Sequence, residues 1–346
     1  SAFAPMEKTL DFDFTDVYNT VAEQRAKRTL SDDIVIVSID GCSREGITEA
    51  LDYVDYLNPA AIGLDVFFNY PAATDPELIT SLTQCPNLVF PVGLQMINGH
   101  ASIFGSYFYD DISIEHKGVV NLSANSVRNV IRDFEPEYIV GNDTIRSFSA
   151  ELARVAAPEK FEALMARGRS KETINYPSWE FEIIPAEALS NGDIPLEEVR
   201  QSIEGKVVLI GNIFDQSDFH LTPIDEGMAG LLIHARALQT ILDSCYIEET
   251  SEAISWVMAI ALSFIFILLV LVIKKRCAFE GCFVRFLQLA LMYAFLVLGC
   301  NVFAHRGDYL NFAPTLLMLG LGMLAMDIWL GLLKAVKIHI HKNRKR

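Results

Sequence analysis

Cysteine is scarce in this sequence, and its placement excludes both a zinc site and a disulfide framework. Six cysteines are spread over 346 residues, with no Cys-x-x-Cys pair and no Cys/His cluster of zinc-binding spacing. Only Cys42, Cys85 and Cys245 precede residue 250, so at most one internal disulfide can form in that part. We therefore expect an ordinary hydrophobic core there, which a chain of this length can supply.

The motifs of common enzyme classes are also missing. The chain has no phosphate-binding GxxxxGK[ST] loop, no GxGxxG after a strand, no HExxH and no GxSxG. These absences argue against P-loop nucleotidases, dinucleotide-dependent oxidoreductases, zinc proteases and serine hydrolases of the common types. We expect that the protein is not an enzyme, and the sequence identifies no cofactor and no particular metal.

Positive charge is sparse before residue 250 and dense after it. The formal net charge is −16, yet residues 251–346 hold 11 of the 28 basic residues and only 4 of the 44 acidic ones. The preceding part is thus strongly acidic, which argues against binding to nucleic acid, because phosphates require clustered Lys and Arg. Proteins, cations and neutral molecules are the expected partners.

Three long apolar stretches predict a three-helix transmembrane region at residues 251–333. They cover residues 254–273, 283–303 and 312–333, and only Asp327 interrupts the last. About 20 apolar residues are needed to cross roughly 30 Å of hydrocarbon, so each stretch is long enough.

The charges that flank these stretches predict their orientation. Lys and Arg surround the connection after the first stretch and fill residues 334–346, a basic tail, so both are expected in the cytoplasm. Residues 1–250 are then extracytoplasmic. An exported domain needs a signal peptide or an anchor ahead of it, and since the chain opens with Ser1, we expect that segment to have been removed or to precede this numbering.

Residues 29–250 show the pattern of an α/β domain with a mainly parallel sheet and β-rich insertions. A membrane-proximal helix is expected in residues 1–28. Buried strands are predicted at residues 34–39, 61–64, 87–92 and 206–211, and helices at 44–57, 76–83, 147–169 and 230–242. Residues 101–145 suggest hairpins, and residues 183–190 suggest a short segment that ends in a brief helix.

Six segments in a characteristic order resemble one known family. They are IVIVSID at 34–40, GLDVFF at 63–68, GVVN at 118–121, GKVVLIG at 205–211, DFHLTP at 218–223 and GLLIHA at 230–235. Together they resemble the CHASE2 family of bacterial extracytoplasmic sensory domains, over about residues 8–245. The resemblance implies a sensory domain on the periplasmic side of the bacterial inner (cytoplasmic) membrane, in a multi-pass protein that takes part in signal transduction.

Family members are usually joined to a catalytic output domain, whereas only residues 334–346 follow the third apolar stretch here. We therefore expect a sensory or interaction module that relays its signal through a partner protein. Other membrane proteins are the expected partners, and the chain is also expected to form a homo-oligomer. The alternative is a structural subunit of a cell-envelope protein complex that uses the CHASE2-like domain for docking. A third hypothesis is an unrecognised hydrolase with Asp40 and Asp65 as its acid/base pair.

Asp40 and Asp65 are the first candidate ligand-binding residues, because each follows the carboxyl end of a predicted parallel strand, where ligands of α/β sheets bind. If the two strands are neighbours, the carboxylates lie about 5 Å apart. The alternative is that they cap helices or bind backbone amides. Gly211 would give a ligand access to the same edge, or only make a turn.

Asp218 and His220 are further candidates in an acidic loop that also contains Asp215. The carboxylate oxygens of Asp215 and Asp218 suit calcium, but the spacing matches no 12-residue calcium loop, and an ordinary solvated loop is the alternative. His234 lies on the apolar face of a helix, which favours a buried, hydrogen-bonded histidine over a ligand.

Asp327 stands within the third apolar stretch, where an ionisable group costs several kcal/mol unless it is paired. It is expected to contact another membrane helix, to lie near the inner interface, or to act in a proton or ion relay. Gln288 and Asn301, in the second stretch, are candidate partners within the chain.

Overall fold

The computed structural model describes residues 14–97, 99–123, 129–177, 179–276 and 280–343. They divide into two compact units. The first contains residues 23–247, and the second contains residues 14–22 and 248–343. Each unit is described by itself below.

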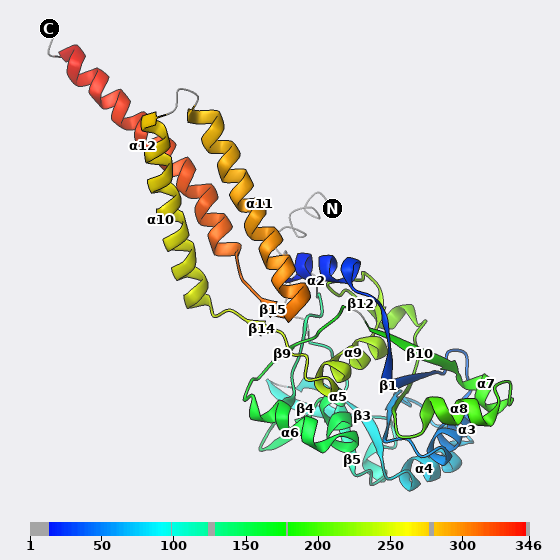
Figure 1. Cartoon of the computed structure of the whole chain (residues 1–346). Helices are drawn as coiled ribbons and strands as arrows, with labels where there is room; N and C mark the ends of the chain where they lie inside the picture. Colours follow the sequence, from blue (N-terminus) through cyan, green and yellow to red (C-terminus); the bar gives the residue numbers. More distant parts are fainter. Residues whose placement is uncertain (1–13, 98, 124–128, 178, 277–279, 344–346) are drawn as a thin grey trace. The chain divides into compact units, whose positions relative to one another are not determined.

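A seven-stranded sheet forms the centre of the first unit (Figure 1). The strand order is β10-β1-β11-β2-β3-β4, with β5 also paired to β3, and every pair is parallel except β3 with β4. The strands are β1 (Thr29–Ser38), β2 (Ala61–Asp65), β3 (Leu88–Ile97), β4 (His100–Phe104), β5 (His116–Val119), β10 (Trp179–Pro185) and β11 (Val207–Gly211). The predicted mainly parallel sheet and its four buried strands are confirmed.

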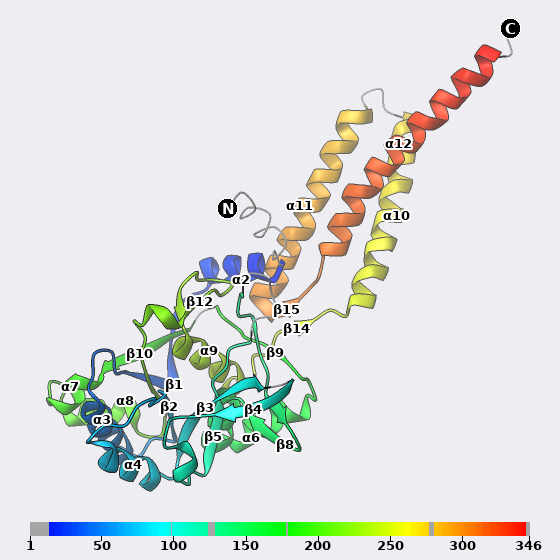
Figure 2. The ribbon, with the colours of Figure 1, turned by 180° about the vertical axis from the view of Figure 1, so that it is seen from behind.

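Both faces of the sheet are covered by helices (Figures 1 and 2). In β1, Val35 and Val37 pack into one core and Ile34 and Ile36 into the other, and all four are fully buried. The first core is completed by α3 (Arg44–Tyr56), α4 (Asp75–Gln84), α7 (Ala186–Ser190) and α8 (Leu196–Ile203), and the second by α5 (Phe148–Ala156), α6 (Pro158–Ala166) and α9 (Gly230–Leu242). A continuous run of β-branched residues is thus explained by burial on both sides.

Residues 147–169 are helical as predicted, and they form two helices because Pro158 begins the second and cannot continue the hydrogen bonding of the first. One sequence prediction in this unit needs correction. Within residues 101–145, β7 (Glu137–Val140) and β8 (Asp143–Arg146) form a predicted hairpin, but β5 is a parallel strand of the central sheet. Its four residues carry too little pattern to reveal that pairing.

The remaining short elements make up the β-rich insertions. They are β6 (Asp133–Phe134) with β9 (Glu172–Thr173), β12 (Phe219–His220) with β13 (Met228–Ala229), and the 3-10 turns η1 (Tyr109–Asp111) and η2 (Gln216–Asp218). The pair β12–β13 brings the acidic loop to the start of α9, which matters for the site below.

The second unit is built from long helices. It contains residues 14–22 of α2 (Phe14–Arg25), together with β14 (Glu248–Glu249), α10 (Glu252–Arg276), α11 (Glu280–Arg306), β15 (Asp308–Tyr309) and α12 (Ala313–Asn343). The part of the predicted first helix that precedes Phe14 lies outside the described residues. In α2, the Tyr18 hydroxyl donates a hydrogen bond of 3.1 Å to the Leu310 carbonyl, and its ring packs on Phe303 and Tyr309.

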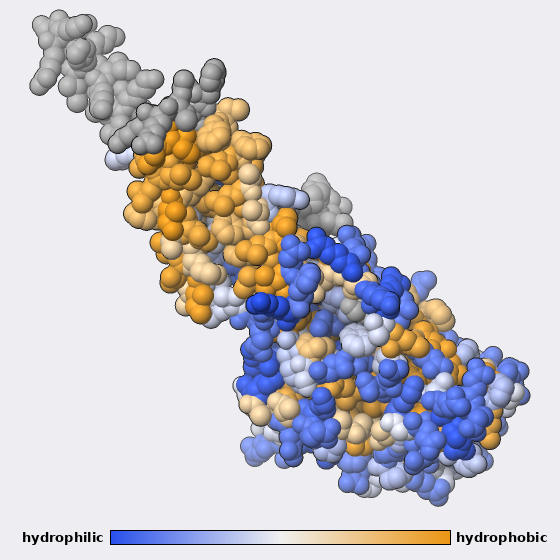
Figure 3. All heavy atoms as spheres, viewed as in Figure 1, coloured by the Kyte–Doolittle hydropathy of each residue, from blue (hydrophilic) through white to orange (hydrophobic). Residues whose placement is uncertain are grey.

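Two helices of this unit are long and apolar enough to cross a membrane. The segments are Glu252–Ile273 in α10 and Gly281–Arg306 in α11, and Figure 3 shows a mainly hydrophobic surface along the coloured parts of the long helices. The corresponding apolar part of α12, Ala313–Trp329, is shorter, so the third predicted span stays a prediction.

A buried ion cluster fixes β5 against α5. The Glu151 side chain is 3% exposed and accepts hydrogen bonds from Arg154 at 2.6 and 2.9 Å and from Arg146 at 3.3 Å, with the His116 Nδ1 atom 3.1 Å away. Burial alone would raise the pKa of Glu151, but the neighbouring Arg154, Arg146 and His116 hold this pKa below its usual value. Because β5 leads directly into the cavity described below, this cluster positions one wall of the site.

Replacing Glu151 by Gln should lower the free energy of unfolding by about 2 kcal/mol, because the substitution leaves the partly buried Arg146 and Arg154 without their carboxylate. The pKa of Glu151 is lowered on folding, so its contribution is present at neutral pH and is lost as the pH falls through the folded pKa. Chemical denaturation at pH 7 and pH 3 measures this. The exposed Glu159→Gln is the matched control, and equal effects of the two variants would contradict the assignment.

Candidate functional site

A cavity of about 390 Å³ opens at the carboxyl edge of the central sheet. Its walls come from the ends of β2, β4, β5 and β11, from the acidic loop after β11, and from the first turn of α9. The lining residues are Asp65, Val66, Phe67, Gly93, Phe104, Val120, Asn121, Leu122, Asn212, Asp215, Asp218, His220, Gly230 and His234. The volume suits a small molecule, and this edge is where parallel sheets bind their ligands.

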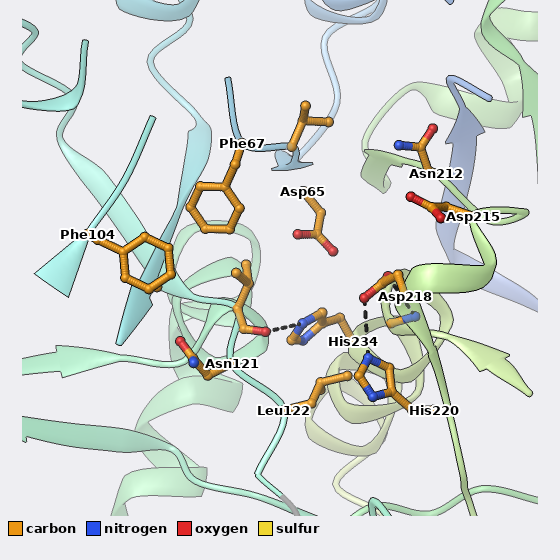
Figure 4. Close-up of a pocket in the computed structure, with 14 residues that line it drawn as sticks. Asp65, Phe67, Phe104, Asn121, Leu122, Asn212, Asp215, Asp218, His220 and His234 are labelled. Atoms are coloured by element: carbon orange, nitrogen blue, oxygen red, sulfur yellow. Dashed lines mark hydrogen bonds and ion pairs between the residues drawn. The ribbon is translucent and has the colours of Figure 1, made fainter. Parts of the chain in front are cut away.

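Asp65 is the central polar group of the cavity. It is the last residue of β2, and Figure 4 shows its carboxylate directed into the space between Phe67 and Asp218. No described residue forms a hydrogen bond to this carboxylate. Burial, together with the nearby Asp218 carboxylate, raises the pKa of Asp65 to about 7, although His220 acts in the opposite direction. Asp65 therefore changes its charge near neutral pH.

Asp218 connects the cavity to the beginning of α9. One of its carboxylate oxygens accepts a hydrogen bond of 3.1 Å from the Gly230 amide, and the other lies 3.2 Å from Nε2 of His220. The side chain of Ala229, the residue before α9, cannot cap the helix, so Asp218 supplies that contact from a separate loop. Only glycine fits at position 230, because a Cβ atom there would lie 2.7 Å from the Asp218 carboxylate.

His234, one turn into α9, lies at the base of the cavity. It is 4% exposed, its Nε2 atom donates a hydrogen bond of 3.2 Å to the Val120 carbonyl, and its ring packs edge-to-face on Phe148. Burial lowers the pKa of His234 to about 4, so the ring is neutral at pH 7. The expectation of a buried, hydrogen-bonded histidine is confirmed, and the structure adds that this histidine lines the cavity.

Aromatic rings and amide groups complete the walls. Phe67 and Phe104 stack with their ring centroids 5.5 Å apart on one side of the cavity (Figure 4). The Phe104 ring lies directly over Gly93, where a Cβ atom would approach it to 2.1 Å. The Asn121 side chain is held at both ends by the backbone of Leu94, through bonds of 2.5 and 3.1 Å. The Asn212 side chain, which follows β11, forms no hydrogen bond with any described residue.

Of the five ligand-binding candidates, Asp65, Asp218 and His220 meet in this cavity, whereas Asp40 and Gly211 do not line it. The predicted pairing of Asp40 with Asp65 is wrong, because β11 lies between β1 and β2. Two strand spacings put their ends roughly 10 Å apart.

The Asp40 carboxylate binds backbone instead, as the alternative hypothesis stated. It accepts hydrogen bonds from the amides of Ile213 at 2.9 Å and Phe214 at 3.0 Å and from the Ser38 hydroxyl at 2.6 Å. Gly211 is buried, and a Cβ atom there would press on Leu231 of α9 at 3.1 Å, so it permits close packing and not ligand access.

Sequence reasoning missed Phe67, Phe104, Asn121 and Asn212 as site residues. Phe67 and Asn121 lie within the family-like segments GLDVFF and GVVN, which offered a signal, but Phe104 and Asn212 lie outside every such segment. Within the described part of the chain, no three His, Cys, Asp or Glu side chains are grouped to hold a metal ion.

The membrane-helix candidates form a polar network in the second unit. Asp327 on α12 pairs with Arg285 on α11, and not with Gln288 or Asn301. Arg285 also donates a hydrogen bond of 3.0 Å to Gln288, whose amide donates one of 3.1 Å to the Leu319 carbonyl of α12. Asn301 lies nearer the other end of α11, where its carbonyl accepts a bond from His305. Asp327 pairs with Arg285 because this residue, one helical turn before Gln288 on α11, carries a positive charge, whereas Gln288 and Asn301 are neutral.

The chain matches a known protein family. Residues 3–274 match a protein family described as the CHASE2 domain, which is an extracytoplasmic sensory domain family. No curated protein and no solved structure matches the chain. The matched range contains every residue that lines the cavity.

Replacing Asp65 by Asn should stabilise the ligand-free protein, and the stabilisation over the wild type should be larger at pH 8 than at pH 5. The folded pKa of Asp65, about 7, lies above the unfolded value, so this group makes the wild-type fold less stable as the pH rises through that interval. Compared with the wild type, Asp65→Asn should gain about 2 kcal/mol between the two pH values. His234 titrates in both proteins, so its effect cancels. Denaturant unfolding measures the difference, with the exposed Asp193→Asn as control, and a gain of the same size in the control would contradict the prediction.

Proposed function

The chain belongs to the CHASE2 domain family, and from this premise we propose that it is a membrane-anchored sensory module. In the proposal, a small molecule outside the cytoplasm occupies the cavity at the sheet edge. Its binding is relayed through the membrane helices to a partner protein. The single observation that carries the proposal is the cavity itself, whose walls include an unpaired carboxylate and the first turn of α9.

The chain connectivity supports a route for the signal. The N-terminal turn of α9 lines the cavity with Gly230 and His234, and its C-terminal end at Leu242 is followed within residues 243–251 by β14 and then by α10. α10 contains the first of the two segments that can cross a membrane. A change in the hydrogen bonding at the N-terminal end of α9 can therefore reach a membrane helix through the body of α9 and a short stretch of backbone.

The proposal includes a topology in the bacterial inner membrane. The first unit faces the periplasm, all three long helices cross the membrane, and the C-terminal basic tail lies in the cytoplasm. The support is the asymmetry of basic residues, since Lys and Arg are retained on the cytoplasmic side.

We also propose that the site binds without turnover. Asp40, which would have to act with Asp65 in a hydrolase, is held by two backbone amides on the far side of β11. The other groups near Asp65 are a neutral histidine and an Asp–His pair that already caps α9. This arrangement suits recognition of a ligand more than proton transfer to one.

The second candidate function is docking within a cell-envelope complex. Exposed apolar side chains on the first unit favour it, namely Tyr70, Met96, Ile97, Ile139 and Phe214. Extraction in mild detergent separates the two functions. A docking subunit co-elutes with its partner in fixed proportion and shows no response to small molecules, whereas a sensor responds to a ligand.

Thermal unfolding of the full chain in lipid nanodiscs, against a library of metabolites and ions, tests sensing directly. A ligand that binds the folded state at 100 times its dissociation constant should stabilise the protein by about 2.7 kcal/mol. The shift should vanish in Asn212→Trp, which fills the cavity, and persist in Asn191→Trp, which changes an exposed loop. If no compound shifts the wild type, or if both variants still respond, the sensory proposal is rejected.

The topology is tested by a membrane-impermeant maleimide on intact bacterial cells with a permeabilised outer membrane. Cys85 is unsuitable as a reporter because it is buried and its pKa is raised to about 12, so its thiol does not react. Asn191→Cys, in an exposed loop of the first unit, should be labelled without lysis. Lys342→Cys should be labelled only after lysis, with the unaltered protein as the background control. The reverse pattern would invert the proposed orientation.

A further inference from the structure

We infer that the cavity at the sheet edge recognises a small organic amine in its cationic form, with Asp65 as the group that binds the ammonium and the stacked Phe67 and Phe104 rings as the wall for its hydrocarbon part. The inference rests on the proposed function, because it names the class of ligand for the same cavity.

The charges around the cavity favour a cation. Three lining residues are carboxylic acids, Asp65, Asp215 and Asp218, and the buried His234 is neutral at pH 7. None of the described residues that line the cavity is Lys or Arg. A phosphate, a carboxylate or an amino acid would therefore meet repulsion without any cationic group to bind its anionic end.

The hydrogen bonds already formed show which groups remain for a ligand. Both oxygens of Asp218 are engaged, by the Gly230 amide and by His220, and both ends of the Asn121 amide are engaged by Leu94. Asp65 and Asn212 have no partner among the described residues. A sugar needs several free donors and acceptors, and this cavity offers too few. A single ammonium needs one strong acceptor, and Asp65 is that acceptor.

A bound cation stabilises the ionised form of Asp65 more than it would stabilise an exposed carboxylate. Its desolvation penalises the ionised form, and an ammonium at hydrogen-bond distance offsets that penalty. An inorganic divalent cation finds fewer ligands here, because no three acidic, His or Cys side chains are grouped for coordination in the described part of the chain.

The aromatic pair accounts for the rest of the ligand. Phe67 and Phe104 are stacked with 26° between their planes, adjacent to Asp65 (Figure 4). Phe104 is 39% exposed, which leaves apolar ring surface free at the cavity. Ring faces attract cations and bury hydrocarbon, so a carboxylate beside two phenyl rings fits an amine that carries an apolar or aromatic group.

Three probes that share the phenethyl group and differ in charge test the inference. Phenethylamine, 2-phenylethanol and 3-phenylpropionate are titrated calorimetrically into the full chain in nanodiscs at pH 8. We expect phenethylamine to bind and the neutral and anionic probes to bind at least about 10-fold more weakly. Asp65→Asn should weaken the binding of phenethylamine by at least about 10-fold. Asp193→Asn, which loses the same charge at an exposed position, should leave the affinity unchanged.

A variant that binds the amine more tightly than the wild type must be folded, so its result cannot be attributed to misfolding. Asn212→Asp adds a carboxylate at the β11 wall of the cavity, so it should tighten amine binding several-fold. Wild-type affinity should fall about 10-fold from pH 8 to pH 6, because Asp65 becomes protonated, and Asp65→Asn should lose most of this dependence.

The possible failures are distinguishable. If 2-phenylethanol or 3-phenylpropionate binds as well as the amine, or if Asn212→Asp weakens the amine, the amine assignment is overturned while a sensor for another ligand class still stands. The amine assignment is also overturned, and the sensory function still stands, if none of the probes binds but the metabolite library yields a ligand whose binding is abolished by Asn212→Trp. If neither the library nor the probes bind, both the amine assignment and the sensory function are rejected.

Discussion

A desolvated carboxylate at the end of a parallel strand is the constraint on which the site depends. Asp65 can occupy this position because β2 is flanked by β11 and β3 and covered by helices on both faces, so its last residue is fixed by the whole sheet. A carboxylate removed from water without a partner is unfavourable, and proteins tolerate it where a ligand supplies the missing interaction. The sheet fixes the end of the strand, and the Asp65 carboxylate points into the cavity (Figure 4).

The same sheet edge joins the cavity to the start of α9. Asp218 makes one contact with a helix amide and one with His220, both within hydrogen-bond distance, and Gly230 is the residue that gives it room. The helix itself is fixed elsewhere by buried polar contacts, including the Gln239 side chain, which bonds Ser31 at 2.6 Å. A rigid helix body with one end capped by a loop residue can transmit a change at that end along the chain.

The sequence predicted the layers and strands of this domain well, because runs such as residues 34–39 are buried on both faces and have no other stable placement. It predicted the site only in part. The insertion of β11 between β1 and β2 depends on a strand more than 140 residues away, and no local pattern encodes it. For that reason Asp40 was paired with Asp65 wrongly, whereas Asp218 and His220 were found because a dense acidic loop is visible locally. Phe104 joined the site only through the pairing of β4 with β3.

A sensor must bind its ligand with different free energies in two states, since a ligand of equal affinity for both shifts nothing. In the proposed module, that difference arises at Asp218. A cation bound to Asp65 also attracts the Asp218 carboxylate, which raised the pKa of Asp65 in the empty site by repulsion. It therefore competes with the Gly230 amide and with His220 for the same two oxygens. The state in which α9 is capped and the state in which it is released thus differ in ligand affinity. The short segment from Leu242 to α10 then carries that difference toward the membrane.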